Sequence, residues 1–402
     1  MSAEIVLQEL KDWLQLNGGY FHPHIRLQKV PSGFCVVASE SLPPDSKIVS
    51  CPFTLAITKP VALNALSGLL GPQANSELAT WTERQLISVY LSFHRIPSSP
   101  HILAHNPYVK SLPSQDSLRT SLHFTPAELE RFKGSNLYGA TIDRRREWRA
   151  EWMQCQGPLS VADREWAEQL TWELYLTSAT YVSSRAFPST LLSQNVSLTS
   201  PSEPEPILLP GVDSLNHARA EPVSWVQSYI GSGPEPGPGS SISLTLHNSA
   251  AAGAELFNNY GVKPNSELIL GYGFSLPNNP DDTIVLKIGG IEGKKWEVGR
   301  DARGADGVWE SILELTGGSE PTYEDYLDAA AALGDMVQTL LDRLPPLSVA
   351  PSDDMREDVA VMLNHYIQGQ REILESLIVY ASGKEELGVA MAREQGIEVV
   401  LE

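Results

Sequence analysis

The chain has 402 residues, of which 42% are hydrophobic and 19% are charged, and this composition is typical of a globular protein with two or three domains. No apolar run reaches the roughly 20 residues that a membrane helix needs, and the first turns lack the apolar core of a secretory signal, so we expect no membrane partner. The formal net charge of −20 disfavours binding to nucleic acid, because phosphates would be repelled.

Charge and cysteine content also bear on partners and compartment. A strongly acidic chain suits a basic protein partner, such as a ribosomal protein or a translation factor, although the same charge could serve solubility alone. Cys35, Cys51 and Cys155 form no Cys-x-x-Cys pair, so a structural zinc site is not expected. An odd number of thiols fits a reducing compartment. We therefore expect a monomer without a metal site, located in the cytoplasm, the nucleus or both.

The N-terminal part predicts one helix followed by strands. Apolar residues at helical spacing indicate a helix over 5–16, and Asn17-Gly18-Gly19 ends it, because these residues tolerate a left-handed conformation. Strand-like runs follow at 24–27, 34–38 and 47–52.

Between residues 58 and 192 the pattern becomes helical. Apolar residues recur at helical spacing over 82–94, 137–152 and 163–181. Thr125 and Glu128 form a capping box, with proline at the first helical position. The tryptophans of this block are expected in the core, because large aromatic side chains dominate buried helix faces.

The remaining elements alternate strands and loops, then become helical. We expect strands over 222–230, 241–247 and 282–288, a Gly/Pro-rich loop over 231–239, a short helix over 264–270, a charged loop or short strand over 294–303, and long helices over 323–344 and 355–381.

Three polar blocks stand out in the second half of the chain. The first is Pro210-Gly211-Val212-Asp213-Ser214-Leu215-Asn216-His217 and the second is Glu255-Leu256-Phe257-Asn258-Asn259-Tyr260-Gly261. The third runs from Asn265 to Phe274 as Asn-Ser-Glu-Leu-Ile-Leu-Gly-Tyr-Gly-Phe. Such runs of small, polar and aromatic residues suit a pocket for a polar small molecule.

In this order the blocks resemble the C-terminal half of a SET domain, the fold of protein-lysine methyltransferases, in the branch of Rubisco large-subunit methyltransferase. The resemblance implies an α+β fold with short β-sheets around a cofactor site, a helical insert and a mainly helical C-terminal domain. It implies an N-terminal SET segment over 1–60, the insert over 61–192, a C-terminal SET segment over 193–290 and a substrate-binding domain over 291–402. The last segment could instead be a packing module that only stabilises the catalytic part.

The resemblance also implies a site for S-adenosylmethionine. Arg185 would hold the methionine carboxylate of the cofactor, since a guanidinium offers a planar fork to a carboxylate. A turn at Pro31-Ser32-Gly33-Phe34-Cys35 would lay its backbone against the cofactor, although Cys35 replaces the usual second glycine. The cofactor-binding residues implied in this way are Ser32, Phe34, Arg185, Asn216, His217, Tyr260 and Phe274.

Tyr260 is the candidate catalytic residue, because its hydroxyl could orient the amine and contact the transferred methyl group. Phe187 favours a lysine substrate, since related actin-histidine methyltransferases carry a polar residue there. The substrate-binding residues that the resemblance implies are Ser184, Arg185, Phe187, Asp213 and Tyr272.

Taken one at a time, several of these residues also fit simpler roles. Arg185 could be a cation at a helix end, and Tyr260 could be an ordinary packing residue of a strand. Asp213 and His217 lie four residues apart, a spacing that metal ligands can use, but no third ligand is evident.

The predicted reaction is methyl transfer to a lysine amine. Free lysine has a pKa of about 10.4, so the site must favour the neutral amine, and proximity to a sulfonium cation does so. We thus predict an S-adenosylmethionine-dependent protein-lysine N-methyltransferase that acts on a non-histone protein such as a ribosomal protein or elongation factor. The alternatives are a catalytically inactive SET-fold binding module and a protein-histidine methyltransferase.

Overall fold

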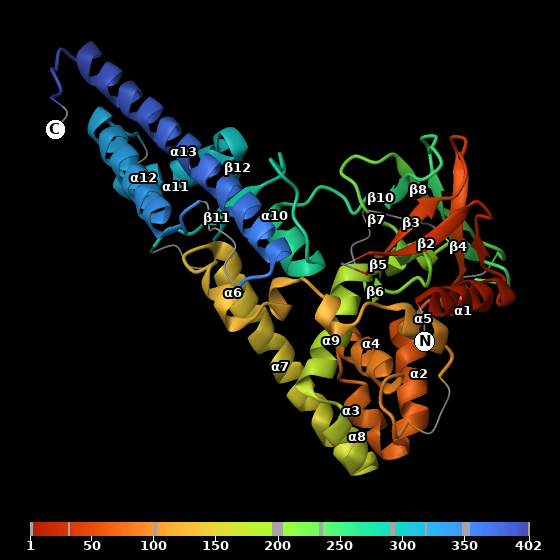
Figure 1. The fold of residues 1–402 in the computed structure, drawn as a ribbon. Coiled ribbons are helices and arrows are strands. Elements are labelled where there is room, and N and C mark those ends of the chain that lie inside the picture. The colour runs from red at the N-terminus through yellow and green to blue at the C-terminus, as the bar shows by residue number, and fades with distance from the viewer. Residues whose placement is uncertain are drawn as a thin grey trace. The chain divides into compact units, whose positions relative to one another are not determined.

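The computed structural model describes residues 3–30, 33–99, 103–194, 204–232, 236–289, 294–317, 320–347 and 354–400. The chain divides into two compact units, and Figure 1 labels their elements. The first unit comprises Met1–Leu118 and Arg145–Gly261, and the second comprises Arg119–Arg144 and Val262–Glu402. The four segments predicted at 1–60, 61–192, 193–290 and 291–402 remain a prediction.

The first unit contains two four-stranded sheets with the strand orders β1-β4-β9-β8 and β2-β3-β10-β7, and a two-stranded sheet β5-β6. All described pairings are antiparallel except β10 with β7, which is parallel. The strands are β1 (Tyr20–Phe21), β2 (Ile25–Val30), β3 (Gly33–Ala38), β4 (Ser46–Pro52), β5 (Phe187–Pro188), β6 (Pro206–Ile207), β7 (Asn216–His217), β8 (Val223–Ser228), β9 (Ser241–Leu246) and β10 (Glu255–Asn258). The strands predicted in this part of the chain are confirmed.

The core of the first unit joins both four-stranded sheets to the first helix. Val36 of β3, Val49 of β4 and Leu244 of β9 are fully buried in one cluster, and Leu14 of α1 (Ala3–Leu16) belongs to the same cluster. Burial of such side chains contributes roughly 1.5–3 kcal/mol each, so α1 is part of this core and no loose appendage. Helix α1 contacts both β1 and α5, and Figure 1 shows it next to α5.

Helices fill the rest of the first unit, and α4 packs against both α2 and α9. A capping box at Thr82 starts α4 where the sequence predicts a helix, and Trp148 is buried as expected, whereas Trp152 is only half-buried. The helices are α2 (Lys59–Leu70), α3 (Asn75–Leu78), α4 (Glu83–Phe93), α5 (Asn106–Ser111), α8 (Arg164–Gln169), α9 (Trp172–Arg185) and the part of α7 (Asn136–Ala162) that follows Arg144.

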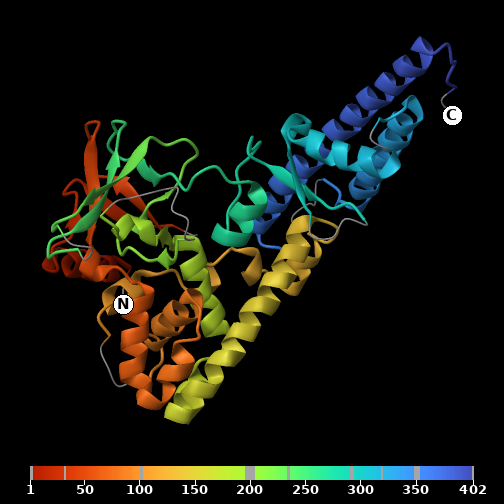
Figure 2. The same cartoon turned by 180° about the vertical axis from the view of Figure 1, so that it is seen from behind.

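The second unit is mainly helical, and α12 packs along α13 (Figure 2). Strands β11 and β12 pair in an antiparallel two-stranded sheet. The elements are α6 (Pro126–Glu130), the first turns of α7, α10 (Asn265–Glu267), a π-helical turn (Leu268–Tyr272), β11 (Thr283–Leu286), β12 (Trp296–Gly299), α11 (Ala305–Thr316), α12 (Tyr323–Arg343) and α13 (Glu357–Glu394).

The helices of the second unit differ from prediction in two places. Helix α11 was not predicted, although Val308, Trp309 and Ile312 of this helix are buried at helical spacing. Helix α13 continues to Glu394 instead of ending at residue 381. Small residues explain the extension, because Gly388 lies so close to Leu327 of α12 that an added Cβ would approach the Leu327 Cδ2 atom to 3.1 Å. A search for large apolar residues does not detect such a contact.

Candidate active site

The first polar block folds as a 3₁₀ turn, Val212–Ser214, followed by β7. Gly211 allows this turn, because its φ is +85° and an added Cβ would lie 3.0 Å from Leu14 Cδ2 and 3.1 Å from Phe21 Cζ. The turn therefore rests directly on the core of the first unit, which holds Asp213 in a buried position.

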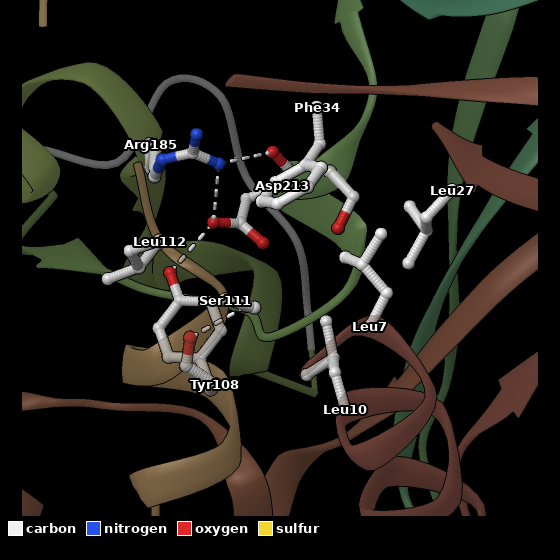
Figure 3. Close-up of a pocket in the computed structure, with 10 residues that line it drawn as sticks. Leu7, Leu10, Leu27, Phe34, Tyr108, Ser111, Leu112, Arg185 and Asp213 are labelled. Atoms are coloured by element: carbon white, nitrogen blue, oxygen red, sulfur yellow. Dashed lines mark hydrogen bonds and ion pairs between the residues drawn. The ribbon is translucent and has the colours of Figure 1, made fainter. Parts of the chain in front are cut away.

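Arg185, the last residue of α9, forms an ion pair with Asp213. Its NH1 donates to the backbone oxygen of Asp213 at 2.9 Å and to the carboxylate Oδ2 at 3.2 Å. The hydroxyl of Tyr108 in α5 donates to the same Oδ2 at 2.7 Å (Figure 3). A cation at a helix C-terminus also interacts favourably with the helix dipole. Three elements that are distant in sequence thus meet at one carboxylate.

The charges of this cluster depend on burial and on each other. Burial raises the pKa of the Asp213 carboxyl, and the Arg185 guanidinium and the Tyr108 hydroxyl oppose this rise. Burial alone would lower the pKa of Arg185, but the Asp213 carboxylate outweighs it and the net pKa is raised. Burial also raises the pKa of Tyr108, which keeps the phenol protonated as a donor. Arg185 is therefore a firmly held cation.

A pocket opens beside this cluster, and Figure 3 shows Arg185 on one side of it and Leu7, Leu10 and Leu27 on the other. Leu7 and Leu10 reach it from α1, and Phe34 reaches it from β3. An ionic end and an apolar wall are thus combined in one concave site, which suits a ligand with a charged group and an apolar or aromatic part.

Asn216 connects β7 to the neighbouring strands. Its side-chain amide donates to Glu255 Oε1 at 2.8 Å and makes a longer contact of 3.5 Å to the backbone oxygen of Phe34. The parallel pairing places Asn216 opposite Phe257 of β10. Through its contact with Phe34, the Asn216 amide lies beside a strand residue that lines the pocket.

His217 and Tyr260 form a stacked pair, with ring centroids 5.1 Å apart and an interplanar angle of 26°. The backbone N–H of Tyr260 donates to His217 Nδ1 at 3.0 Å, so this ring nitrogen acts as an acceptor and carries no proton. The Tyr260 hydroxyl donates to the backbone oxygen of Leu215 at 2.8 Å. Tyr260 is thus attached to the same loop that carries Asp213.

The structure brings the first-unit candidates together through the segment 213–217: Phe34, Arg185, Asp213, Asn216, His217 and Tyr260. Ser184 lies in the last turn of α9, where its hydroxyl donates to the Thr180 carbonyl. Phe187 is buried, with its ring 5.2 Å from that of Trp225 in an edge-on arrangement. The functional roles of these residues remain predictions.

Three candidates lie elsewhere. Ser32 lies outside the described residues. Tyr272 and Phe274 belong to the second unit, where their rings meet edge-on at 6.3 Å, so their contribution to the site also remains a prediction. Burial raises the pKa of Tyr272, against the effect of the nearby Lys263 ammonium.

Two residues at the site were not predicted from the sequence. Tyr108 has no motif around it, and from the sequence a lone tyrosine in a short helix is indistinguishable from a packing residue. Glu255 was part of the second block without an assigned role; its alternation with the apolar Leu256 in a strand was the available signal.

Comparison with solved structures decides the fold. The SET domain of LSMT bound to lysine and AdoHcy matches with a TM-score of 0.77 and 16% identity, covering 98% of this chain and 96% of that chain. Rubisco LSMT bound to AdoMet matches with a TM-score of 0.74 and 15% identity, covering 97% of this chain and 95% of the other. The chain has the SET-domain fold of LSMT. The predicted LSMT-type α+β fold with a helical insert and a helical C-terminal part is confirmed.

Sequence comparison finds lysine methyltransferases. The chain is 32% identical to Ribosomal lysine N-methyltransferase set10 of Schizosaccharomyces pombe, over 63% of this chain and 42% of the relative. It is 29% identical to Ribosomal lysine N-methyltransferase 1 of Saccharomyces cerevisiae, over 45% and 34%. Protein-lysine N-methyltransferase EFM1 of the same yeast is 25% identical, over 72% and 53%. The chain thus spans about half or less of the length of these curated relatives. No protein-family model matches the chain.

The matched LSMT structures hold AdoHcy or AdoMet, and the donors at the pocket of this chain suit a ligand that carries a carboxylate. Among the described residues, both hydrogen bonds of the Arg185 guanidinium use NH1, so Nε and NH2 remain as donors for a carboxylate. Leu7 and Leu10 supply apolar surface to the pocket, and the Asn216 amide contacts the backbone oxygen of the pocket residue Phe34.

Proposed function

We propose that this chain is an S-adenosylmethionine-dependent protein-lysine N-methyltransferase that acts on a non-histone protein, such as a ribosomal protein or a translation elongation factor. The observation that carries the proposal is the set of contacts that joins Arg185, Asn216 and Tyr260 through one loop of an LSMT-type SET fold. The similarity to two ribosomal lysine methyltransferases and to EFM1 supports the choice of reaction and substrate class.

Binding of the cofactor would use the charged end of the pocket. Arg185 would pair with its carboxylate through Nε and NH2, while NH1 stays on Asp213. Asn216 would bind it through hydrogen bonds, with the leucines of α1 excluding water from the apolar wall. When bound, S-adenosylmethionine supplies a methyl group on a sulfonium cation.

Tyr260 would then orient the lysine amine. Because its hydroxyl proton is already given to the Leu215 carbonyl, the phenol oxygen presents lone pairs and acts as an acceptor. An acceptor near the reacting atoms favours an N–H of the neutral amine and weak C–H contacts of the methyl group. Alignment of this kind can contribute roughly 7–11 kcal/mol to lowering the barrier.

The charge of the chain supports a basic substrate. A net charge of −20 attracts the lysine- and arginine-rich proteins of the ribosome and of translation, and raises the rate of encounter with them. The cytoplasm and the nucleus, where such proteins are made and assembled, are the compartments that fit this proposal.

The proposal is tested by labelling. Purified protein is incubated with tritiated S-adenosylmethionine and a candidate substrate, which is ribosomal subunits in one reaction and elongation factor in another. The labelled residue is then identified by mass spectrometry. Isothermal titration gives the Kd of the cofactor for the wild type, for Arg185→Ala and for the control Arg164→Ala, whose side chain is 88% exposed in α8.

We expect methyl-lysine on one protein, and a loss of cofactor affinity of about a hundredfold in Arg185→Ala only. Failure of the wild type to bind the cofactor would support an inactive binding module. Label on histidine would replace the lysine assignment.

A further inference from the structure

Tyr108 holds a position that the proposed reaction does not require. Its side chain is only 1% exposed, yet its hydroxyl reaches across from α5 to the Asp213 carboxylate at 2.7 Å. A buried phenol usually finds a partner, but here the partner is the anion that holds the cofactor-binding arginine. Tyr108, which has no role in the proposed methyl transfer, is therefore linked to the charged end of the pocket (Figure 3).

We propose that Tyr108 is a positioning residue for the carboxylate of S-adenosylmethionine, acting through Asp213 and Arg185. This inference rests on the proposed function. Its chemistry is a competition, because Arg185 must serve two carboxylates, that of Asp213 and that of the cofactor.

The hydroxyl of Tyr108 favours the binding of Arg185 to the cofactor carboxylate in this competition. By donating to Asp213 Oδ2 it satisfies part of the carboxylate, which then draws on Arg185 through NH1 alone. The contact also fixes the rotation of the Asp213 carboxylate, since Oδ2 is held from two sides. The Nε and NH2 edge of the guanidinium is thereby left for the incoming carboxylate. Without the hydroxyl, Asp213 would turn further toward Arg185 and occupy that edge.

The position of Tyr108 is itself fixed by helix α9, which carries Arg185. Tyr181 of α9 donates its hydroxyl to the backbone oxygen of Pro113. Arg95, which follows α4, donates both to the Tyr181 hydroxyl and to the backbone oxygen of Val109, each at 3.1 Å. These bonds hold the chain directly after Tyr108 against α9. The donor and the ion pair that it supports are therefore parts of one rigid arrangement, as a positioning role requires.

The first unit contains a second cluster of the same chemistry, which provides a matched control. Tyr175 is fully buried and donates its hydroxyl to Glu151 Oε2 at 3.0 Å, and Arg84 pairs with that carboxylate. Tyr175 lies ten residues before Arg185 on α9, or about 15 Å along the helix. Removing its hydroxyl disturbs a tyrosine–carboxylate–arginine cluster without touching the pocket.

The experiment compares Tyr108→Phe and Tyr175→Phe with the wild type by isothermal titration with two probes. S-adenosylmethionine carries the carboxylate, whereas 5′-methylthioadenosine shares its nucleoside and sulfur but lacks the amino-acid part. We expect Tyr108→Phe to weaken S-adenosylmethionine about tenfold and methylthioadenosine less than about twofold. Tyr175→Phe should leave both Kd values within about twofold of the wild type, and a thermal melt checks that both variants are folded.

Steady-state kinetics adds an independent measurement. In Tyr108→Phe the KM for S-adenosylmethionine should rise about tenfold, while kcat at saturating cofactor changes less than about twofold. Equal weakening of both probes, or equal effects of the two substitutions, would mean general loosening of the fold and would overturn the inference. Unchanged S-adenosylmethionine binding in Tyr108→Phe would also overturn it. A wild type that does not bind S-adenosylmethionine would instead refute the proposed function.

Discussion

At the residue scale, Tyr260 is held in the candidate site by two different groups, one at its ring and one at its hydroxyl. The ring of Tyr260 stacks on His217, and its hydroxyl gives its proton to the backbone carbonyl of Leu215. The ring is thus fixed by packing and the oxygen by a hydrogen bond to the loop. A residue held in this way can act on a substrate without being needed to retain the cofactor.

We predict that Tyr260→Phe separates binding from transfer. The ring and its stacking on His217 are retained, so the Kd for S-adenosylmethionine should stay within about twofold. Transfer should fall by about a hundredfold or more, the size of effect seen when one polar group of a preorganised site is removed. Titration calorimetry and single-turnover labelling measure the two quantities, and undiminished transfer would remove Tyr260 from the mechanism.

At the element scale, the segment that carries Tyr272 and Phe274 is closed by the fully buried side chain of Asn265. The Asn265 Nδ2 donates to the Leu276 oxygen at 2.9 Å, and the Leu276 N–H donates back to Asn265 Oδ1 at 2.7 Å. Between these residues the chain forms the π-helical turn and then reverses at Gly273, whose φ is +82°. Asp282 accepts from both the backbone and the side chain of Asn265.

We predict that Asn265→Ala lowers the free energy of unfolding by about 2–3 kcal/mol, because the Leu276 N–H and the Asp282 carboxylate lose a buried partner. Urea unfolding measures this change. The exposed Asn75→Ala is the control and should change stability by less than about 0.5 kcal/mol. A similar small effect at Asn265 would show that the segment is held by other contacts.

Asp282 adds a pH dependence to the same element. Burial raises its pKa to about 6, against the opposing effects of the Asn265 N–H and the Arg300 guanidinium. The folded state therefore binds this proton more tightly than the unfolded state, whose carboxyl titrates near 3.9. The contribution of Asp282 to the free energy of unfolding should fall as the pH rises from about 4 to about 6.

We predict that the wild type loses about 2 kcal/mol relative to Asp282→Asn between about pH 4 and pH 7. The comparison concerns the slope with pH, so a constant stability difference between the two proteins does not affect it. Urea unfolding of both proteins at several pH values provides the test. Parallel curves would mean that Asp282 does not titrate in this range.

At the scale of the whole molecule, the net charge of −20 is the property that bears on function. Attraction to a basic substrate is screened over about 8–10 Å at physiological salt, whereas the buried Arg185–Asp213 pair is screened much less. We predict that raising the salt from about 50 to 300 mM increases the KM for the protein substrate severalfold. The Kd for S-adenosylmethionine should change much less. Equal salt dependence of both would argue against electrostatic capture of the substrate.

Also at this scale, no helix among the described residues combines the length and the apolar character needed to cross a membrane.

Local patterns in the sequence predicted most of the helices and strands, and the order of the motifs along the chain pointed to the fold. Period and capping residues predicted α4, α6 and most of α13, because they depend on contacts within a few residues. The three polar blocks pointed to the SET fold and to Asn216 and Tyr260, and the resemblance that the blocks carry pointed to Arg185. Helix α11 was not predicted although Val308, Trp309 and Ile312 recur at helical spacing, whereas the end of α13 contains small residues that form no strong apolar period.

Contacts between side chains that are distant in the sequence are seen in the folded chain alone. Tyr108 and Asp213 are 105 positions apart, and Arg185 and Asp213 are 28 apart, so no local pattern records their contact. Burial raises the pKa of Asp213 and strengthens each hydrogen bond to its carboxylate. This burial arises only when α1, α5, α9 and the sheets pack together. Residue types follow from sequence, whereas their energies follow from the surroundings that the fold assembles.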